Sequence, residues 1–438
     1  MELRFNRKFS MELTEFSPRF CPCCGEPKNE IKDGVEIIKR CTCDWERGFH
    51  DRVRKTIHYS FWRDGVVTIK DWSPPLFKDG GPGRFKTFIK IQKAVAIHKL
   101  YDFCFKFIGK TPENKKVYAL DKNMERGRSF YIRGPLGSGR GTLLSQIKFF
   151  AAFRDISTTP NPADWATFKS EIAQCNWNGK EAEIAKDNVS DQYRQVKLLT
   201  LENVKGEESK FPFKGASLID DLLTKRNLNH GCNIFTSSDF VGQLGNLVGD
   251  RLPEILMSEG TSIVLLFHPT EADALLNAVI RRRIKLEDII AKCNFGQSKT
   301  HQDSLQEDKN LELVKELLYI NEAFGCLPLS LSLQSVSKLQ TESLVEQLGL
   351  KPEQFHEKIQ KVWAAFGVSK EEKGLEYEEA LKRVYISVIK ECPELGNRMT
   401  EKEMIETGKM IRLACSEKDV INKYINDAQQ LREKMFNE

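Results

Sequence analysis

The chain has 438 residues, of which 40% are hydrophobic, and a formal net charge of +5. This length allows two or three domains, whereas no apolar run approaches the roughly 20 residues of a membrane span and the N-terminus lacks the apolar core of a signal peptide. Twelve cysteines, five of them between positions 21 and 43, argue against a secreted disulfide framework and predict a cytoplasmic protein with one metal site.

The cysteine cluster near the N-terminus predicts a zinc site. Two groups of cysteines, at 21–24 and 41–43, are separated by sixteen residues. Thiolates two to four positions apart on a turn can face one tetrahedral Zn²⁺, and two such turns complete the site. The expected ligands are Cys21, Cys24, Cys41 and Cys43. Cys23 is a possible replacement for Cys21 or Cys24, and His50 is a weaker one; residues 34–39 between the turns predict a strand.

A basic segment follows, with fourteen Lys/Arg and five Asp/Glu between positions 78 and 133. Aromatic residues are interleaved with these cations: Phe77, Phe85, Phe88, Tyr101, Phe103, Phe105 and Phe107. Such a combination can hold a nucleic-acid backbone and stack on bases. The alternative is an amphipathic helix at about 86–108, with its aromatics in the core and its lysines in water.

The pattern at 134–142, Gly-Pro-Leu-Gly-Ser-Gly-Arg-Gly-Thr, predicts a phosphate-binding loop. A strand is expected before it at 129–133 and a helix after it at 143–152, which is the context that lets backbone N–H groups converge on a phosphate. We expect Gly134, Gly137, Gly139, Arg140, Gly141, Thr142 and Ser238 to line the nucleotide site. However, Arg140 replaces the usual lysine and Gly141 replaces the usual Mg²⁺-binding hydroxyl, so hydrolysis is not expected. The hydroxyl of Thr142 stands one position after the place where the Mg²⁺-binding hydroxyl usually lies.

Three later segments complete the expected α/β core. The run 215–222 predicts a strand that ends in Asp220 and Asp221, an arrangement that holds Mg²⁺ and orients water in ATPases. A second strand at 232–238 ends in Ser238, and a third strand is expected at 262–267. Alternating strands and helices indicate a parallel sheet covered on both faces. Arg251 is either an arginine finger for a neighbouring nucleotide or a surface ion-pair residue.

The order of these parts resembles the DnaC/DnaI/IstB-type helicase-loader ATPases of the AAA+ superfamily. The resemblance covers about 21–268 and rests on the cysteine groups, on 72–77, 134–142 and 218–222, and on 234–239 and 249–251. It implies bound ATP or ADP with Mg²⁺, oligomerisation, and a helicase, single-stranded DNA or a transposase as partner. By position, Gly139, Arg140 and Thr142 would face phosphate, Asp220 and Asp221 would face Mg²⁺, and Ser238 would be the sensor. Besides Arg140 and Gly141, the chain departs from the family at Ser238, at Ile255, and at 223–231, which is too short for the usual helix.

The last third of the chain predicts helices and no chemistry. A helix from Ala274 leads into a basic cluster at 281–285, which is either a DNA contact or a solvated helix end. After a polar linker at 296–310, further helices are expected at 311–324, 341–348, 352–366, 377–391, 401–409 and 417–436, the fifth with Thr400 as its cap.

Together these patterns predict an α/β protein in four parts. They are a zinc module at 1–60, a basic linker and helix at 61–127, an AAA+-type P-loop parallel sheet core at 128–295, and an all-helical partner-binding domain at 296–438. The expected function is that of a DNA-replication accessory protein of a bacterium, phage or mobile element with a degenerate nucleotide site. The alternatives are an active ATPase that assists a transposase or helicase, and a structural assembly subunit without nucleotide.

Overall fold

The computed structural model describes residues 29–32, 35–38, 52–53, 55–56, 83–160, 164–175, 180–205, 216–244, 251–292, 351, 386 and 388–435. The strands are β1 Asn29–Lys32, β2 Val35–Ile38, β3 Phe107–Lys110, β4 Lys116–Tyr118, β5 Ser129–Arg133, β6 Leu198–Val204, β7 Cys232–Ser237 and β8 Thr261–Leu265. The helices are α4 Gly83–Leu100, α5 Ala119–Glu125, α6 Arg140–Phe153, α7 Trp165–Gln174, α8 Lys180–Val189, α9 Ala216–Leu228, α10 Val241–Leu244, α11 Arg251–Met257, α12 Pro269–Lys292, α17 Pro393–Gly396, α18 Glu401–Ala414 and α19 Lys418–Lys434, with π-helices η3 Tyr101–Phe105 and η4 Ser190–Arg194. None of these helices combines the length and apolarity needed to cross a bilayer.

The described chain forms two compact units. The first contains Met1–Asp79, Lys93–His268 and Asn426–Glu438, and the second contains Gly80–Gln92 and Pro269–Ile425. The predicted strand at 34–39 is confirmed as β2, which pairs with β1 in an antiparallel hairpin. The predicted zinc ligands Cys21, Cys24, Cys41 and Cys43 lie outside the described residues, as do Cys23 and His50.

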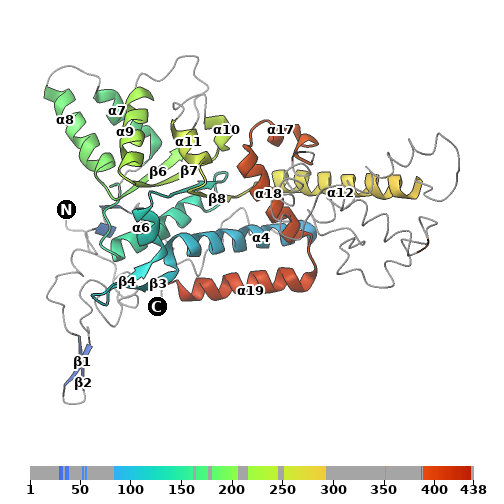
Figure 1. The fold of residues 1–438 in the computed structure, drawn as a ribbon, viewed down its shortest axis with the longest axis horizontal. Helices are drawn as coiled ribbons and strands as arrows, with labels where there is room; N and C mark the ends of the chain where they lie inside the picture. The colour runs from blue at the N-terminus through green and yellow to red at the C-terminus, as the bar shows by residue number, and fades with distance from the viewer. Residues whose placement is uncertain are drawn as a thin grey trace. The chain divides into compact units, whose positions relative to one another are not determined.

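A four-stranded sheet in the order β6-β7-β5-β8 forms the centre of the first unit. All described pairings in it are parallel, which confirms the predicted parallel α/β core. Its middle strands are buried along their whole length, as expected for a sheet covered on both faces. Helix α6 lies on one face of the sheet and helices α9, α10 and α11 lie on the other (Figure 1).

The predicted strand at 215–222 is wrong, because residues 216–222 belong to helix α9. Ile219, Leu222 and Leu223 are buried, whereas Asp220 is half-buried and Asp221 is exposed. Apolar residues three and four positions apart line one face of a helix, so the short run Leu-Ile-Asp-Asp-Leu-Leu packs as a helix on the sheet. On the side away from β5, β7 pairs with β6. The sequence predicted no strand in the region that forms β6.

The basic segment forms a helix followed by a hairpin. Helix α4 continues into η3, and the chain then turns into the antiparallel pair β3–β4. Phe88, Phe103 and Phe105 are buried, which confirms the core role of these aromatics. Phe107 is 41% exposed, by contrast, and starts the hairpin.

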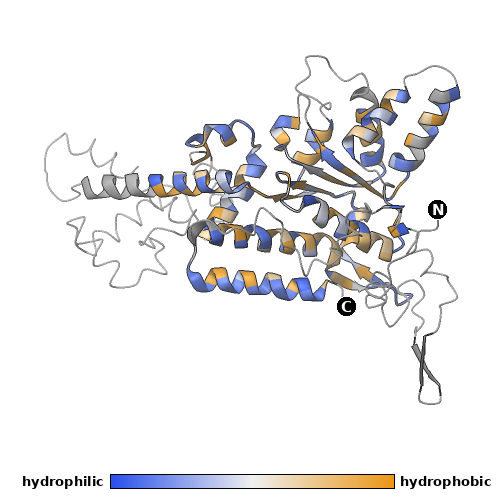
Figure 2. Ribbon diagram, turned by 180° about the vertical axis from the view of Figure 1, so that it is seen from behind, coloured by the Kyte–Doolittle hydropathy of each residue, from blue (hydrophilic) through white to orange (hydrophobic). Residues whose placement is uncertain are grey.

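The described part of the second unit is helical. Helix α12 continues to Lys292, so the arginines at 281–283 lie within the helix and not at its end; Arg282 pairs with Glu391 at 3.8 Å. Helix α18 begins at the predicted cap, where the Thr400 side chain accepts from the Glu403 backbone N–H and the Glu403 carboxylate accepts from Thr400. Helix α19 confirms the last predicted helix and is mostly hydrophilic in Figure 2. The helices predicted at 311–324, 341–348 and 352–366 lie outside the described residues.

Candidate functional site

The predicted phosphate loop connects β5 to α6 at the carboxyl edge of the sheet. The Gly134 N–H donates to the Ser237 carbonyl at 2.9 Å, and the Leu266 N–H donates to the Arg133 carbonyl at 2.8 Å. These bonds hold the start of the loop between the ends of β7 and β8. Gly137 and Gly139 have φ values of 81° and 84°, a backbone region that glycine adopts without steric cost. The strand–loop–helix prediction is therefore confirmed.

Gly134 is required by close packing inside this loop. A Cβ atom there would lie 2.9 Å from the Leu266 Cβ and would overlap the Ser138 hydroxyl. Ser138 is fully buried, and within the described part of the chain its Oγ has no hydrogen-bond partner. The inner side of the loop is thus tightly packed, whereas Leu136 at its tip is 88% exposed.

Arg140, which stands at the lysine position, is directed toward β6. It is 8% exposed, and its Nη2 donates to Oδ1 of Asn203 at 3.0 Å. Nη1 has no partner among the described residues and is buried as well. Burial is the main cause that lowers the pKa of Arg140; the charge of Arg133 acts in the same direction, and Asp239 and Glu202 oppose it. A guanidinium titrates so high that it stays charged.

A β-bulge at the end of β6 positions the acceptor for Arg140. The β6–β7 register shifts between Leu201 and Val204, and Asn203 within this step has a φ of 55°. Its backbone N–H donates to Oγ1 of Thr236 at 3.1 Å. Bulges re-aim side chains at functional sites, and asparagine tolerates this left-handed conformation better than most residues.

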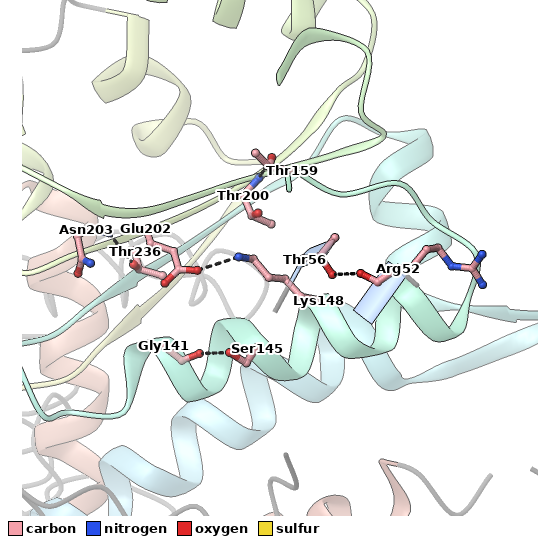
Figure 3. A network of polar contacts seen from close by, with 10 residues as sticks. All are labelled: Arg52, Thr56, Gly141, Ser145, Lys148, Thr159, Thr200, Glu202, Asn203 and Thr236. Carbon is pink, nitrogen blue, oxygen red and sulfur yellow. Dashed lines mark hydrogen bonds and ion pairs between the residues drawn. The ribbon is translucent and has the colours of Figure 1, made fainter. Parts of the chain in front are cut away.

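Lys148 and Glu202 form an ion pair beneath the loop. Lys148 lies two turns after Arg140 on α6, and its Nζ is 2.8 Å from Oε1 of Glu202 (Figure 3). The Lys148 side chain is 1% exposed and that of Glu202 is 20% exposed. The carboxylate at the end of the strand is therefore neutralised by an ammonium of the same chain.

Arg133 and the end of β7 form the opposite wall. Arg133 is buried, donates to the carbonyls of Ser238 and Leu266, and lies 3.8 Å above the centre of the Phe240 ring. The predicted sensor residue Ser238 follows β7 and donates to Oδ1 of Asp239 at 3.1 Å. Among the described residues, Arg133, Arg140 and Lys148 thus lie with Glu202 and Asp239 at this edge, and Arg140 bonds to a neutral amide, so its charge favours an anion.

Asp220 and Asp221, which were predicted to be catalytic, lie on helix α9, and Arg251 lies at the start of α11. The backbone N–H of Arg251 at the start of α11 donates to Oδ1 of Asp220 at 3.4 Å. Asp221 pairs with Lys225 along α9, and the Arg251 guanidinium pairs with Glu254 at 2.7 Å. Helices α9 and α11 cover the face of the sheet opposite to α6 (Figure 1), so Asp220 and Asp221 do not end a strand as expected; the polar residues near the end of β6 are Glu202 and Asn203.

The residues present suit a phosphate group better than they suit Mg²⁺. The loop supplies a helix N-terminus, and it also supplies a charged guanidinium nitrogen and a hydroxyl that have no hydrogen-bond partner among the described residues. Among the described residues, no group of three or more His, Cys, Asp or Glu side chains could hold a metal ion; position 141 is glycine, and Glu202 is paired with Lys148. Thr142 is half-buried in the first turn of α6.

Sequence reasoning missed Glu202, Asn203, Lys148 and Arg133. The signal was present in the run 198–203, Leu-Leu-Thr-Leu-Glu-Asn, in which an apolar stretch ends in two polar residues. It was obscured by the second apolar run ending in acids at 218–221, which lies nearer to the sensor strand. With β6 in place, α9 is the helix between β6 and β7, so the expectation that this helix is too short is wrong as well.

The chain is similar to several solved structures at low sequence identity. No family model matches the chain, and no curated protein matches it either. Among solved structures, a Streptococcus pyogenes serotype M3 protein assigned as a primosome component is 13% identical, covers 50% of this chain and 96% of its own, and has a TM-score of 0.32. DnaI is 14% identical, with 47% and 93% covered and a TM-score of 0.30. A DNA replication initiation factor is 14% identical, with 85% and 97% covered and a TM-score of 0.30.

Proposed function

We propose that the chain is a DNA-replication accessory protein of the helicase-loader type, with an AAA+-like core that does not hydrolyse ATP. The phosphate loop and the strand at 232–238, which pairs with the strand before the loop, support this class, and so does the place of the loop at the carboxyl edge of a parallel sheet, where open α/β sheets bind ligands. In this proposal the core presents surfaces to a replicative helicase, to single-stranded DNA, or to both.

The observation that carries the proposal is the ion pair between Lys148 and Glu202. In phosphoryl transfer, metal ions neutralise developing charge, and a positioned residue orients the attacking nucleophile. Here the one carboxylate at the end of β6 is bonded to Lys148 at 2.8 Å, and Asn203 beside it accepts from Arg140. Glu202 and Asn203 are thus both bonded to side chains of α6. An enzyme that lacks several transition-state contacts at once, each worth roughly 10²–10³ in rate, retains little catalysis.

A bound nucleotide phosphate would be held by the loop N–H groups, by Nη1 of Arg140 and by the Ser138 hydroxyl. Arg140 would supply positive charge in planar geometry, unlike the point charge of a lysine. Nucleotide would then act as a structural ligand that stabilises α6 against β6, and binding would not require Mg²⁺.

Titration calorimetry with ATP, with and without Mg²⁺, tests this function. The proposal predicts binding that does not change when Mg²⁺ is removed. Strictly Mg²⁺-dependent binding with steady turnover would indicate the active ATPase, and no binding under either condition would indicate the structural subunit without nucleotide. The matched variant is Arg140→Met, which removes the charge and is expected to abolish binding, whereas Arg251→Met is expected to leave it unchanged.

A further inference from the structure

We propose that the hairpin β3–β4 is a contact surface for single-stranded nucleic acid. This inference rests on the proposed function for the class of partner, and it assigns the contact to Lys106–Tyr118, called the basic hairpin below. The sequence alone left the role of this basic segment open between a core helix and a nucleic-acid surface. In the structure, the buried aromatic residues precede the hairpin, and the exposed apolar ones lie in it.

The basic hairpin presents apolar and positive side chains together. Phe107 is 41% exposed and Ile108 is 50% exposed. Four lysines, Lys106, Lys110, Lys115 and Lys116, are exposed here beside a single acid, Glu113. Glu113 accepts from the Thr111 hydroxyl at 3.3 Å within the turn. An exposed ring among lysines is the combination that binds single strands, since the ring stacks on bases and the cations follow the phosphates.

The positive charges of the basic hairpin repel one another, and a bound polyanion would relieve this repulsion. Lys110 and Lys116 are direct cross-strand partners, and like charges in directly opposite positions destabilise a hairpin. Lys115 adds a third positive charge next to them. Within the described residues no ion pair involves Lys110 or Lys115, whereas Lys106 pairs with Asp102 at 3.5 Å. The uncompensated charge is therefore concentrated toward the turn.

The basic hairpin is also held rigidly, so binding would order few residues. Its turn has a bond from the Asn114 N–H to the Thr111 carbonyl at 2.9 Å, and Asn114 has a φ of 64°, a recognised three-residue hairpin turn. At its base, Tyr118 packs edge-on against Phe150 with ring centres 5.2 Å apart. Arg154 of the same unit donates to the Lys116 carbonyl at 2.7 Å. Preorganisation of this kind lowers the entropic cost of association.

The experiment measures binding of a fluorescent oligo-dT to the full chain by anisotropy at several salt concentrations. Loss of base stacking in Phe107→Ala is expected to weaken binding roughly 5- to 150-fold, and Phe107→Trp is expected to restore it. The double variant Lys110→Ala, Lys115→Ala should lower the slope of log K against log salt by about 1.4, because each phosphate contact on a single strand contributes roughly 0.7. The matched control replaces Lys180 and Lys197, exposed lysines elsewhere in the same unit, and should leave the slope unchanged.

The outcomes separate this inference from the proposed function. If the wild-type chain binds oligo-dT and the hairpin variants bind equally well, the hairpin assignment is wrong and the nucleic-acid role stands. If the wild-type chain does not bind, the DNA part of the proposed function fails and the hairpin assignment fails with it. If polyglutamate competes as well as oligo-dT and Phe107→Ala has no effect, the surface fits an acidic protein, which overturns the inference in favour of another class of partner.

Discussion

Replacement of Lys148 by methionine tests whether the ion pair holds the phosphate-loop helix to the sheet. Methionine retains much of the apolar stem of lysine but removes the ammonium, so Glu202 loses its counter-charge. Removal of one partner from a buried ion pair costs about 3–5 kcal/mol. Because the Glu202 side chain is 20% exposed and can recover some hydration, we expect the lower end, about 3 kcal/mol.

Hydrogen–deuterium exchange of the α6 and β6 amides measures this effect in the unit where it arises. A loss of about 3 kcal/mol corresponds to roughly 140-fold less protection. The control is Lys225→Met, which breaks an ion pair whose side chains are 41% and 53% exposed and should cost about 0.2–1 kcal/mol. A second control adds Glu202→Gln to Lys148→Met, and the combined loss should be smaller than the sum of the single losses. Protection in Lys148→Met within threefold of wild type, or strictly additive losses, would refute the reasoning.

Four further predictions concern the fold, the loop and the metal. Arg226 is 2% exposed and donates to five acceptors, namely the carbonyls of Tyr193, Arg194, Val196 and Cys232 and Oδ1 of Asn233. In chemical denaturation, Arg226→Met should lower the free energy of unfolding by more than about 3 kcal/mol. An effect no larger than that of the exposed Arg194→Met would contradict this. Thr400→Ala removes the cap of α18 and should raise amide exchange in its first turn by an amount equivalent to about 1 kcal/mol, while exchange in α6 stays constant. Arg140→Lys combined with Gly141→Thr restores the usual loop residues but should give no ATP turnover, because Lys148 still holds Glu202; measurable phosphate release would show that the loop alone limits catalysis. Metal analysis should find one zinc per chain that is lost in Cys24→Ser and Cys41→Ser, and retained zinc in both variants would exclude the expected ligands, with Cys23→Ser as the matched control.

Sequence patterns predicted those elements in which periodicity and special residues agree. The loop at 134–142 carries glycines at positions that require positive φ, so its location between β5 and α6 could be read directly. The strand at 232–238 has an apolar centre and ends in small polar residues, and Thr400 followed by Glu403 indicates a capped helix. In each case local chemistry and tertiary context favour the same structure.

The candidate site was predicted less well because short apolar runs are ambiguous. The stretch 218–223 has apolar residues at spacings that suit either a strand or one face of a helix, and only packing on the sheet decides for α9. The partners of Arg140 could not be predicted, since Asn203 reaches it through a bulge whose position depends on the pairing of β6 with β7. Lys148 looks like an ordinary helix lysine until the fold places it against Glu202.

The most direct test of the central claim is a steady-state measurement of ATP hydrolysis in the presence of Mg²⁺, comparing the wild-type chain with Glu202→Gln. We expect both proteins to release phosphate at the same background rate, since the carboxylate is already neutralised by Lys148. Steady turnover by the wild-type chain that disappears in Glu202→Gln would show that this carboxylate serves catalysis and would contradict the account.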